Sequence, residues 1–507
     1  MGRKSTHYGK KIRINWEGSL FVHHSLGMVN RELLTELLKF PDLDIRHLPY
    51  ETDQFKPGRK SKYLPLTRIE KQPHSDADIH VRHRWPPDFC RPSSGKFVLM
   101  QPWEYGSLPI EWRDAMVDTV DEIWVYSRFL KVCYERSGIP PEKVKVVPLG
   151  IDPDLFNPDA APLLWVRQAC DNRFCFLYNG GVTTRKGTDI LINAYLSEFS
   201  PDEPVCLVIK DSSIYPKGLA EKVRRLSLRS DTARIVYAAE TVAHEELPGL
   251  YTAADCYVHP YRAEGYGLPI AEAMACNLPV IVTGGGACLD FVEPDGGYFV
   301  KCFLETMRSK RVSELVTVDY PFWLIPDTDH LCSVLRYVFT HRDMARQRGE
   351  FAGSGLRTIH TWKTAAAIAQ QRLRVLTGAV AAGNHPGQEH LERNSRIDQA
   401  ISLLQIGSYD EAVALFQKIL IQYGENSLAF EGLAIAAFYK KNYDEACNLF
   451  AAANRISTDN IDIIVNWYEA AKMNSSTGQL VHPVRRAMTH HCENDELRSI
   501  AVDLDIL

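Results

Sequence analysis

The stretch "EGYGLPIAEAMACNLPV" at residues 264–280 carries two glutamates, Glu264 and Glu272, separated by a turn rich in glycine. The apolar run "DCYVHPY" precedes it and has the form of a buried β-strand that ends in a loop. Glu264 is therefore expected just beyond the carboxyl end of a strand. Glu272 is expected in the first turn of the helix that follows.

The start of that helix has the features of an anion site. Gly265 and Gly267 allow the backbone to approach a ligand closely, and Pro269 suits the first turn of a helix. The amides of Gly267 and Leu268 would have no partner within the helix and would attract an anion such as a diphosphate. The segment could therefore bind a sugar, its phosphates and a ribose. A glutamate near a helix start also simply suits the helix dipole, so the glutamate pair alone decides little.

Short apolar strands alternate with helices over most of the chain. "KIRINWEG" (11–18) begins the first series, and "RFCFLYNGG" (173–181) begins the second. Such alternation predicts parallel sheets with helices on both faces. The predicted fold class is α/β, with two doubly wound Rossmann-like domains, residues 1–165 and 166–376, facing a cleft. Ligands of such sheets bind beyond the carboxyl ends of the strands. The last helix, expected at 361–373, returns to the first domain.

The C-terminal region has a different pattern. Residues 377–393 are small and polar and read as a linker, and 394–507 are predicted to be all-α. Within them, "GSYDEAVALF" (407–416) recurs as "KNYDEACNLF" (441–450), 34 residues later. This period resembles the tetratricopeptide repeat, with a degenerate third copy expected near 460–490. Such helix pairs either offer a groove to a protein partner or act as a stabilising appendage, and both readings stay open.

The longer string "HPYRAEGYGLPIAEAMACNLPVIVTGGGACLDFV" (259–292) resembles the signature of glycosyltransferase family 4. "VPLGIDPDLFNPD" (147–159) resembles the interdomain stretch of the same family. The family consists of retaining enzymes of the GT-B fold that use nucleotide-sugar donors. The resemblance extends over most of 11–376. It implies that a sugar moves from a nucleoside-diphosphate sugar to a hydroxyl acceptor, without a metal ion or a cofactor.

The same resemblance assigns residues to the donor phosphates. They fall on "NGGVTTRKGTDILINAYLSEF" (179–199), a glycine-rich loop that enters a helix. Lys186 matches the phosphate-binding lysine of the family, and Arg185 would substitute for an arginine that many members carry just after the first glycine. Gly18, after the first strand, matches a glycine turn that approaches the phosphates. Cations and helix-start amides together suit a diphosphate.

Roles for the two glutamates also follow from the resemblance. Glu264 would hold the hydroxyls of the donor sugar and help to stabilise a cationic ring, which makes it a candidate catalytic residue. Glu272 would bind the ribose hydroxyls. The departing phosphate itself would take the proton of the acceptor.

The first domain is expected to bind the acceptor. His83 matches a histidine that family members often place near the donor sugar, and it is a second catalytic candidate, although a lone histidine is as often structural. Trp103, Glu104 and Tyr105 follow another strand and could line an acceptor sugar. Their rings could equally pack as core against other tryptophans of the domain.

Bulk properties exclude several classes of function. The net charge of −5 without long basic runs argues against a nucleic-acid binder. The twelve cysteines form no Cys-x-x-Cys pair, so no zinc site is expected, and buried free thiols in a reducing compartment are favoured. Neither a signal peptide nor a run of about 18 apolar residues is seen. The expected location is the cytoplasm, with attachment to a membrane surface left open.

Other functions compete with the transferase. A glycosidase needs two carboxyl groups on opposite sides of the scissile bond, whereas Glu264 and Glu272 share one turn and helix. A non-enzymatic alternative is a repeat scaffold with an inactive transferase domain, but Lys186 and both glutamates are intact. The expected partners are a nucleotide sugar, a glycan, lipid or protein acceptor, and a protein bound by the repeats. The sequence does not assign the donor, the acceptor or the insert at 301–324.

Overall fold

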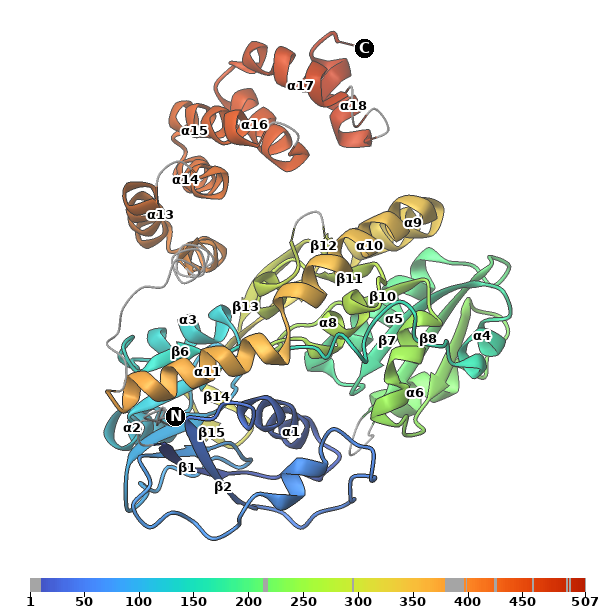
Figure 1. The fold of residues 1–507 in the computed structure, drawn as a ribbon. Coiled ribbons are helices and arrows are strands. Elements are labelled where there is room, and N and C mark those ends of the chain that lie inside the picture. Colours follow the sequence, from blue (N-terminus) through green and yellow to red (C-terminus); the bar gives the residue numbers. More distant parts are fainter. Residues whose placement is uncertain are drawn as a thin grey trace, which may run out of the picture. The chain divides into compact units, whose positions relative to one another are not determined.

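The computed structural model describes residues 11–506 except 213–217, 294–295, 379–395, 398, 424–425, 458–459, 489–490 and 492–493. The chain divides into two compact units, residues 1–383 and 384–507, and each is described by itself. Figure 1 follows the elements of both along the chain.

Six parallel strands form the first sheet of the first unit, in the order β2-β1-β3-β4-β5-β6. Ile14 and Trp16 in β1 have no exposed surface, because helices cover both faces of the sheet. The strands are β1 (Ile12–Glu17), β2 (Leu43–Leu48), β3 (Ile79–Arg82), β4 (Lys96–Met100), β5 (Glu122–Val125) and β6 (Val144–Val146). The helices are α1 (Ser25–Leu37), η1 (Leu64–Arg68), α2 (Ile110–Thr119) and α3 (Arg128–Arg136).

The second sheet also has six parallel strands, in the order β12-β11-β10-β7-β8-β9. Every residue of the long strands β7 and β8 is buried. The strands are β7 (Phe174–Gly180), β8 (Val205–Asp211), β9 (Arg234–Ala238), β10 (Cys256–His259), β11 (Val280–Thr283) and β12 (Tyr298–Val300). The helices are α4 (Leu164–Cys170), η2 (Thr184–Lys186), α5 (Thr188–Glu198), α6 (Leu219–Leu226), η3 (His244–Glu246), α7 (Leu247–Thr252), α8 (Leu268–Ala275), η4 (Ala287–Asp290), α9 (Thr328–Thr340) and α10 (Arg342–Ile359). The predicted architecture of two doubly wound domains, the GT-B fold, is confirmed.

The strand order explains why loops far apart in the sequence meet. The direction of winding reverses between β7 and β10 in the second sheet, and between β1 and β3 in the first. Open parallel sheets bind ligands beyond their carboxyl ends at such a reversal. The loops after β7 and β10 carry Lys186 and Glu264, while those after β1 and β3 carry Gly18 and His83.

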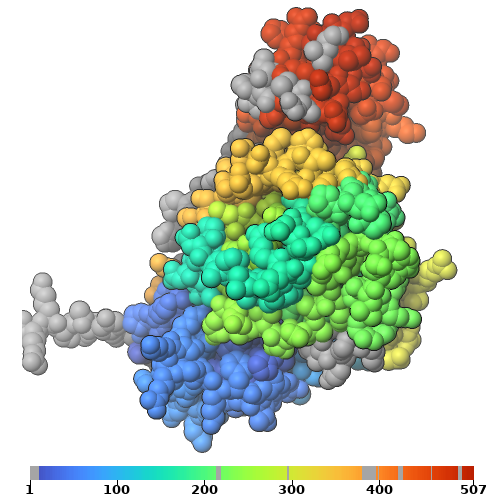
Figure 2. Space-filling view, turned by 90° about the vertical axis from the view of Figure 1, so that its right-hand side faces the viewer, coloured from blue at the N-terminus to red at the C-terminus, as the bar shows by residue number. Residues whose placement is uncertain are grey.

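Helix α11 (Trp362–Leu376) crosses back to the first domain and packs against α1 (Figure 1). The amide of Gln370 donates to Asp42, 2.9 Å away, and Arg374 pairs with the same carboxylate at 2.8 Å. Arg372 makes a bidentate contact with the buried Glu122 in β5. The first domain (blue) and the second (green) adjoin on the face shown in Figure 2.

The unassigned insert folds into two antiparallel strand pairs, called the β-arm below (residues 302–326). Its strands are β13 (Cys302–Thr306), β14 (Arg311–Val312), β15 (Leu315–Val316) and β16 (Phe322–Pro326). The amides of Phe322 and Val318 donate to the carbonyls of Tyr105 and Leu108 in the first domain, at 3.1 and 2.9 Å. The β-arm therefore starts in the second domain and binds the loop of the first domain that was predicted to contact the acceptor.

The second unit is helical throughout its described part. Its elements are a helical segment at 399–405 followed by α13 (Tyr409–Tyr423), α14 (Ser427–Tyr439), α15 (Tyr443–Ile456), α16 (Ile461–Met473), η5 (Thr477–Leu480), α17 (Val481–Met488) and α18 (Asp495–Asp503). Ala400 and Ala434, one repeat apart, are both fully buried at helix contacts. Most of the predicted linker, 377–393, lies outside the described residues.

Two further predictions concerned the cysteines and membrane-spanning segments. The cysteines of the described part are free, and most are buried, although Cys90 is exposed. None of the described helices combines the length and the apolar character that crossing a membrane requires.

Candidate active site

The loop after β7 presents Lys186 toward the loop after β10. The hydroxyl of Thr183 caps η2 by accepting from the amide of Lys186. Gly187 then takes a φ of 71°, and a Cβ there would overlap the carbonyl oxygen of Pro260. Only glycine fits this crossing, because it tolerates both the dihedral and the close approach. As a result Nζ of Lys186 lies 2.6 Å from Oε1 of Glu264.

Glu264 is 7% exposed and lies beside the cations of Lys186 and Arg185. Burial by itself raises the pKa of this carboxyl, but these two cations help to hold it well below the usual value. A buried carboxylate is stable only when paired. The site thus keeps an ionised carboxylate at the strand reversal, as required of a group that faces developing positive charge.

Arg185 links this loop to both domains. Its guanidinium donates to the carbonyl of Ala263 at 2.8 Å. The same nitrogen lies 3.5 Å from Oε1 of Glu104 and 4.0 Å from Oε2 of Glu264. The cation therefore stands between one carboxylate of each domain.

Glu272 is the fifth residue of α8, so its predicted place in the first helical turn was wrong. The helix begins at Leu268, one residue earlier than Pro269 suggests. The carboxylate is buried and accepts from Tyr251 Oη at 2.6 Å, and that hydroxyl accepts from Asn179 at 2.9 Å. Burial raises the pKa of Glu272 to about 7, although the Tyr251 hydrogen bond lowers it.

The start of α8 keeps the features of an anion site. Gly267 has a φ of 94° and turns the chain into the helix. Among the described residues, the amides of Gly267 and Leu268 donate no hydrogen bond. Helix-start amides without partners attract anions.

The structure places Gly18 and His83 deeper than expected. The amide of Gly18 donates to the carbonyl of Leu48 at 3.1 Å, so this group is already used. His83 is fully buried, with Nδ1 2.8 Å from Asn30 and Nε2 2.6 Å from Tyr126. Burial lowers the pKa of His83 to about 3. The ring is therefore neutral, and both of its nitrogens are engaged within the first domain.

The three acceptor candidates separate into two groups. Trp103 packs in the interior against Trp112, with ring centroids 5.0 Å apart. Of the two predicted roles, it therefore has that of a core residue. Tyr105 is half-buried beside it, 5.5 Å from Trp103. Glu104 faces Arg185 across the two domains. The loop thus presents Glu104, rather than a row of aromatic faces, to the loop after β7.

Sequence reasoning missed two residues of the site. His259 ends β10, is fully buried, and has Nε2 3.4 Å from Oε1 of Glu264. Tyr251 fixes Glu272 from α7. A polar residue at the last position of an otherwise apolar strand was the available signal for His259. No local pattern marks Tyr251, because α7 and α8 meet only in the folded chain.

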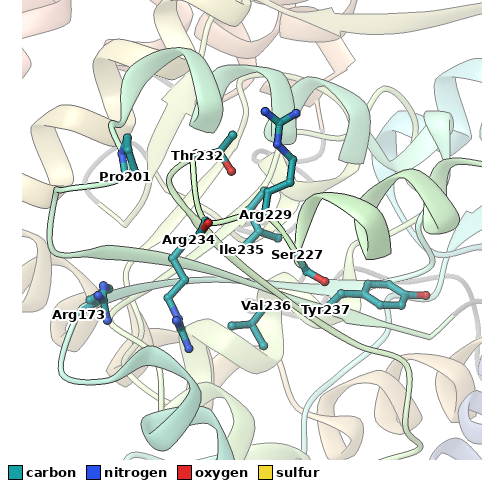
Figure 3. A pocket seen from close by; sticks show the side chains of 10 residues that line it. Arg173, Pro201, Ser227, Arg229, Thr232, Arg234, Ile235, Val236 and Tyr237 are labelled. Atoms are coloured by element: carbon teal, nitrogen blue, oxygen red, sulfur yellow. The ribbon is translucent and has the colours of Figure 1, made fainter.

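A surface cavity of about 370 Å³ lies away from this site, along the edge strand β9. Figure 3 shows its lining side chains, among them Arg173, Arg229 and Arg234. Each of these arginines already has a protein partner, respectively Asp171, Asp231 and the carbonyl of Ala169. The cavity contains none of the candidate site residues. No cluster of three or more His, Cys, Asp or Glu in the described part could hold a metal ion.

Part of the chain is similar in sequence to known proteins. Residues 166–318 match the family model described as "Glycosyl transferases group 1". The mannosylfructose-phosphate synthase of Agrobacterium fabrum is 28% identical over 264 residues, which cover 49% of this chain and 51% of that protein. The chain spans about half the length of the curated relatives that it matches.

Solved structures share the fold. The sucrose-phosphate synthase from Thermosynechococcus elongatus has a TM-score of 0.52 at 18% identity, covering 73% of this chain and all 100% of that one. Anabaena HepE in complex with UDP and glucose has a TM-score of 0.52 at 14% identity, covering 71% and 99%. At this identity the likeness concerns the fold alone. Residues 166–318 are thus similar to group 1 glycosyl transferases in sequence, and the first unit has the GT-B fold.

Proposed function

We propose that this protein is a retaining glycosyltransferase that moves a sugar from a nucleoside-diphosphate sugar to a hydroxyl acceptor. The observation that carries the proposal is the contact of Lys186 with the buried, ionised Glu264 at the strand reversal of the second sheet. One cation and one carboxylate at this place suit the two charges that form when an anomeric carbon–oxygen bond breaks. The match of residues 166–318 to group 1 glycosyl transferases supports the same reaction.

In the proposed reaction, the diphosphate leaves with negative charge. Lys186, Arg185 and the free amides of Gly267 and Leu268 stabilise that charge. Glu264 faces the donor sugar, binds its hydroxyls and stabilises the cationic ring. Since Lys186 pairs with Glu264 in the free protein, it must turn from the carboxylate to the phosphate when the donor binds.

The remaining groups position the two substrates. Glu272, held by Tyr251, accepts from the ribose hydroxyls. The departing phosphate takes the proton of the acceptor hydroxyl, so no metal ion and no cofactor is needed. Glu104 and Tyr105 lie on the acceptor side, and His83 would act by supporting this wall of the site. The acceptor is a glycan, a lipid or a protein, and a lipid acceptor would bring the protein to a membrane surface.

The donor nucleotide and turnover can be tested together. UDP, GDP and ADP are screened by thermal shift, and the matching nucleotide sugars are then assayed for nucleotide release. We expect one nucleotide to stabilise the protein, because a ligand bound only by the native state raises its stability. Lys186→Ala and Glu264→Gln should each lower turnover at least about tenfold, with ~100-fold within reach for electrostatic groups of this kind.

Lys222→Ala, an exposed lysine on α6 of the same domain, is the matched control and should leave turnover unchanged. If the protein binds no nucleotide and consumes no donor sugar, the transferase proposal fails. The alternative, a scaffold with an inactive transferase domain, would then be favoured.

We further propose that the second unit is a tetratricopeptide-like repeat that binds a protein partner. Equivalent positions one repeat apart support it, because Phe416 and Phe450 are both buried in the helix packing. Tyr439 is 60% exposed and stacks on Tyr409. Affinity capture with the full chain and with Tyr439→Ala would test the proposal. Loss of a specific partner in the variant supports it, and identical capture contradicts it.

A further inference from the structure

His259 lies in an unusually closed environment. The imidazole has no exposed surface and is surrounded by the rings of Tyr178, Tyr257 and Tyr261, with centroids 5.3, 5.9 and 5.9 Å away. The charged groups that face it are Glu264, Lys186 and Arg185. Any change of charge at Glu264 is therefore felt directly by this ring.

When the ring of His259 is neutral, the hydrogen bonds around it are one donor short. The hydroxyl of Tyr257 lies 2.9 Å from the carbonyl oxygen of Asn179 and 3.0 Å from Nδ1 of His259. A carbonyl only accepts, so the hydroxyl donates to Asn179 and Nδ1–H donates to the hydroxyl. In a neutral ring, Nε2 is then a bare acceptor 3.4 Å from the carboxylate oxygen of Glu264.

Nε2 has no hydrogen-bond partner within the described residues. An acceptor that faces a carboxylate is unfavourable, and a buried polar atom without a partner costs free energy. A second proton, on Nε2, would complete every hydrogen bond in the chain Asn179–Tyr257–His259–Glu264. The acceptors on both sides of the ring therefore suit an imidazolium, which donates from both of its nitrogens.

Lys186 opposes that protonation in the free protein. Its ammonium donates to the same oxygen, Oε1 of Glu264, at 2.6 Å. Burial lowers the pKa of His259, and the cations of Lys186 and Arg185 lower it further, while Glu264 raises it. Removing Lys186 from Glu264 removes one cation and leaves the carboxylate without its closest partner.

We propose that His259 is a positioning residue. When the donor binds and Lys186 leaves Glu264, His259 accepts a proton on Nε2 and replaces Lys186 as the hydrogen-bond partner of Glu264. The inference rests on the proposed function, since the diphosphate is what draws Lys186 away. The proton comes from solvent and forms an N–H bond at the former lone pair, and no other covalent bond changes. The new N–H donates to Oε1, which fixes the carboxylate toward the donor sugar. When the nucleotide leaves, Lys186 returns and the proton is released.

The test is the number of protons taken up on nucleotide binding. Isothermal titration calorimetry with UDP and with GDP at pH 7.5 is repeated in buffers of different ionisation enthalpy, and the slope gives the proton number. We expect wild type to take up close to one proton more than His259→Gln. The difference between the two proteins cancels protons bound by the nucleotide itself. His341→Gln, a histidine at the junction of α9 and α10, is the control and should behave as wild type.

A second variant allows the test to be made if His259→Gln does not fold. Tyr257→Phe keeps the imidazole but removes the acceptor of Nδ1–H, and its proton uptake should fall while nucleotide still binds. The affinity of wild type should also weaken by up to tenfold per pH unit over the range in which the complex holds the His259 proton and the free protein does not, whereas that of His259→Gln stays flat. Equal proton numbers in wild type and His259→Gln, with nucleotide bound by both, would overturn the inference and leave the transferase intact. No nucleotide bound by wild type would instead refute the transferase itself.

Discussion

At the scale of residues, Lys186 has one role in the free protein, where it contacts Glu264, and another in the proposed complex with the donor. In the free protein it neutralises a buried carboxylate, which would otherwise cost several kcal/mol. In the proposed complex the same cation is released to the diphosphate. A site built in this way has a charge partner ready for each state, and in the free protein Arg185 lies between Glu104 and Glu264.

The crossing at Gly187 provides a test of how tightly the two loops are held. A methyl group there would overlap the carbonyl oxygen of Pro260, and the φ of 71° disfavours any side chain. Gly187→Ala should therefore lower the free energy of unfolding by ~1–3 kcal/mol and weaken nucleotide binding. Thermal unfolding checks the first effect and titration with the nucleotide the second.

The matched control is Gly355→Ala in the exposed part of α10, where a Cβ would meet nothing within 4 Å. Because alanine favours a helix over glycine, this variant should be unchanged or stabilised by about 0.5–1 kcal/mol. Equal stability of Gly187→Ala and Gly355→Ala would contradict the close crossing.

The buried carboxyl of Glu272 should make stability depend on pH. Burial raises its folded-state pKa to about 7, above the value of about 4.3 in an unfolded chain. Folding therefore favours the protonated form. The stabilisation is complete below about pH 4.3 and is lost as the pH rises through 7, a loss of at most about 4 kcal/mol.

Glu272→Gln keeps an acceptor for Tyr251 but cannot ionise. Relative to wild type, its melting temperature should rise between pH 5 and pH 8. Glu142→Gln, an exposed carboxylate of the first domain, should track wild type over this range. A constant difference between Glu272→Gln and wild type at all pH values would show that Glu272 ionises normally.

At the scale of elements, α11 and the β-arm tie the two domains of the first unit together from different directions. Helix α11 satisfies the buried Glu122 with Arg372. The β-arm contributes Phe322, whose ring packs over Gly106 in the first domain. The same ring contacts Phe129, and the two ring centroids are 6.4 Å apart. The loop at 102–109, part of the proposed acceptor site, is therefore held by a segment of the second domain.

Phe322→Ala should loosen the loop at 102–109. The ring lies directly over Gly106, and its loss should weaken the hydrogen bonds from the β-arm to Tyr105 and Leu108. Hydrogen exchange of this loop should accelerate by about tenfold or more, corresponding to a local loss of ~1–3 kcal/mol.

Phe303→Ala changes the same residue type on the same arm, at a position that is 59% exposed, and should leave the exchange unchanged. With an active donor assay, Phe322→Ala should raise the KM for the acceptor more than that for the donor. Equal exchange in both variants would show that the β-arm does not hold the loop.

At the scale of the whole molecule, each of the two units has its own hydrophobic core. The helical unit buries Phe416 in one cluster and Phe450 and Trp467 in another, within its own helices. The first unit has continuous cores on both sides of its sheets. Units with separate cores can unfold separately.

Differential scanning calorimetry should therefore resolve two transitions. The nucleotide that binds should raise only one of them, with a stabilisation of about 2.7 kcal/mol at 100 times its dissociation constant. Phe450→Ala should lower only the other transition, because that ring is buried in the helical unit. A single transition shifted by both changes would mean that the two units unfold as one.

The sequence predicted the two sheets because nearly every strand is a short apolar run followed by a polar loop. It also predicted which loops meet, since Lys186 and Glu264 lie in the loops after strands on either side of the reversal. The β-arm could not be placed in this way. Its strands are half-exposed, and the loop that they contact lies more than 200 residues away in the chain. The amide of Asp319, for example, donates to the hydroxyl of Ser107, 212 residues earlier.

What the sequence by itself determined is local: strand periodicity, a glycine at a forced crossing, and charged residues at strand ends. The tertiary structure alone decided which partners those charges meet. Glu272 is held by Tyr251 from another helix, Trp103 is core rather than a sugar platform, and His259 faces Glu264 inside three tyrosine rings. The physical reason is that burial and charge pairing depend on distances between segments, and no local pattern encodes those distances.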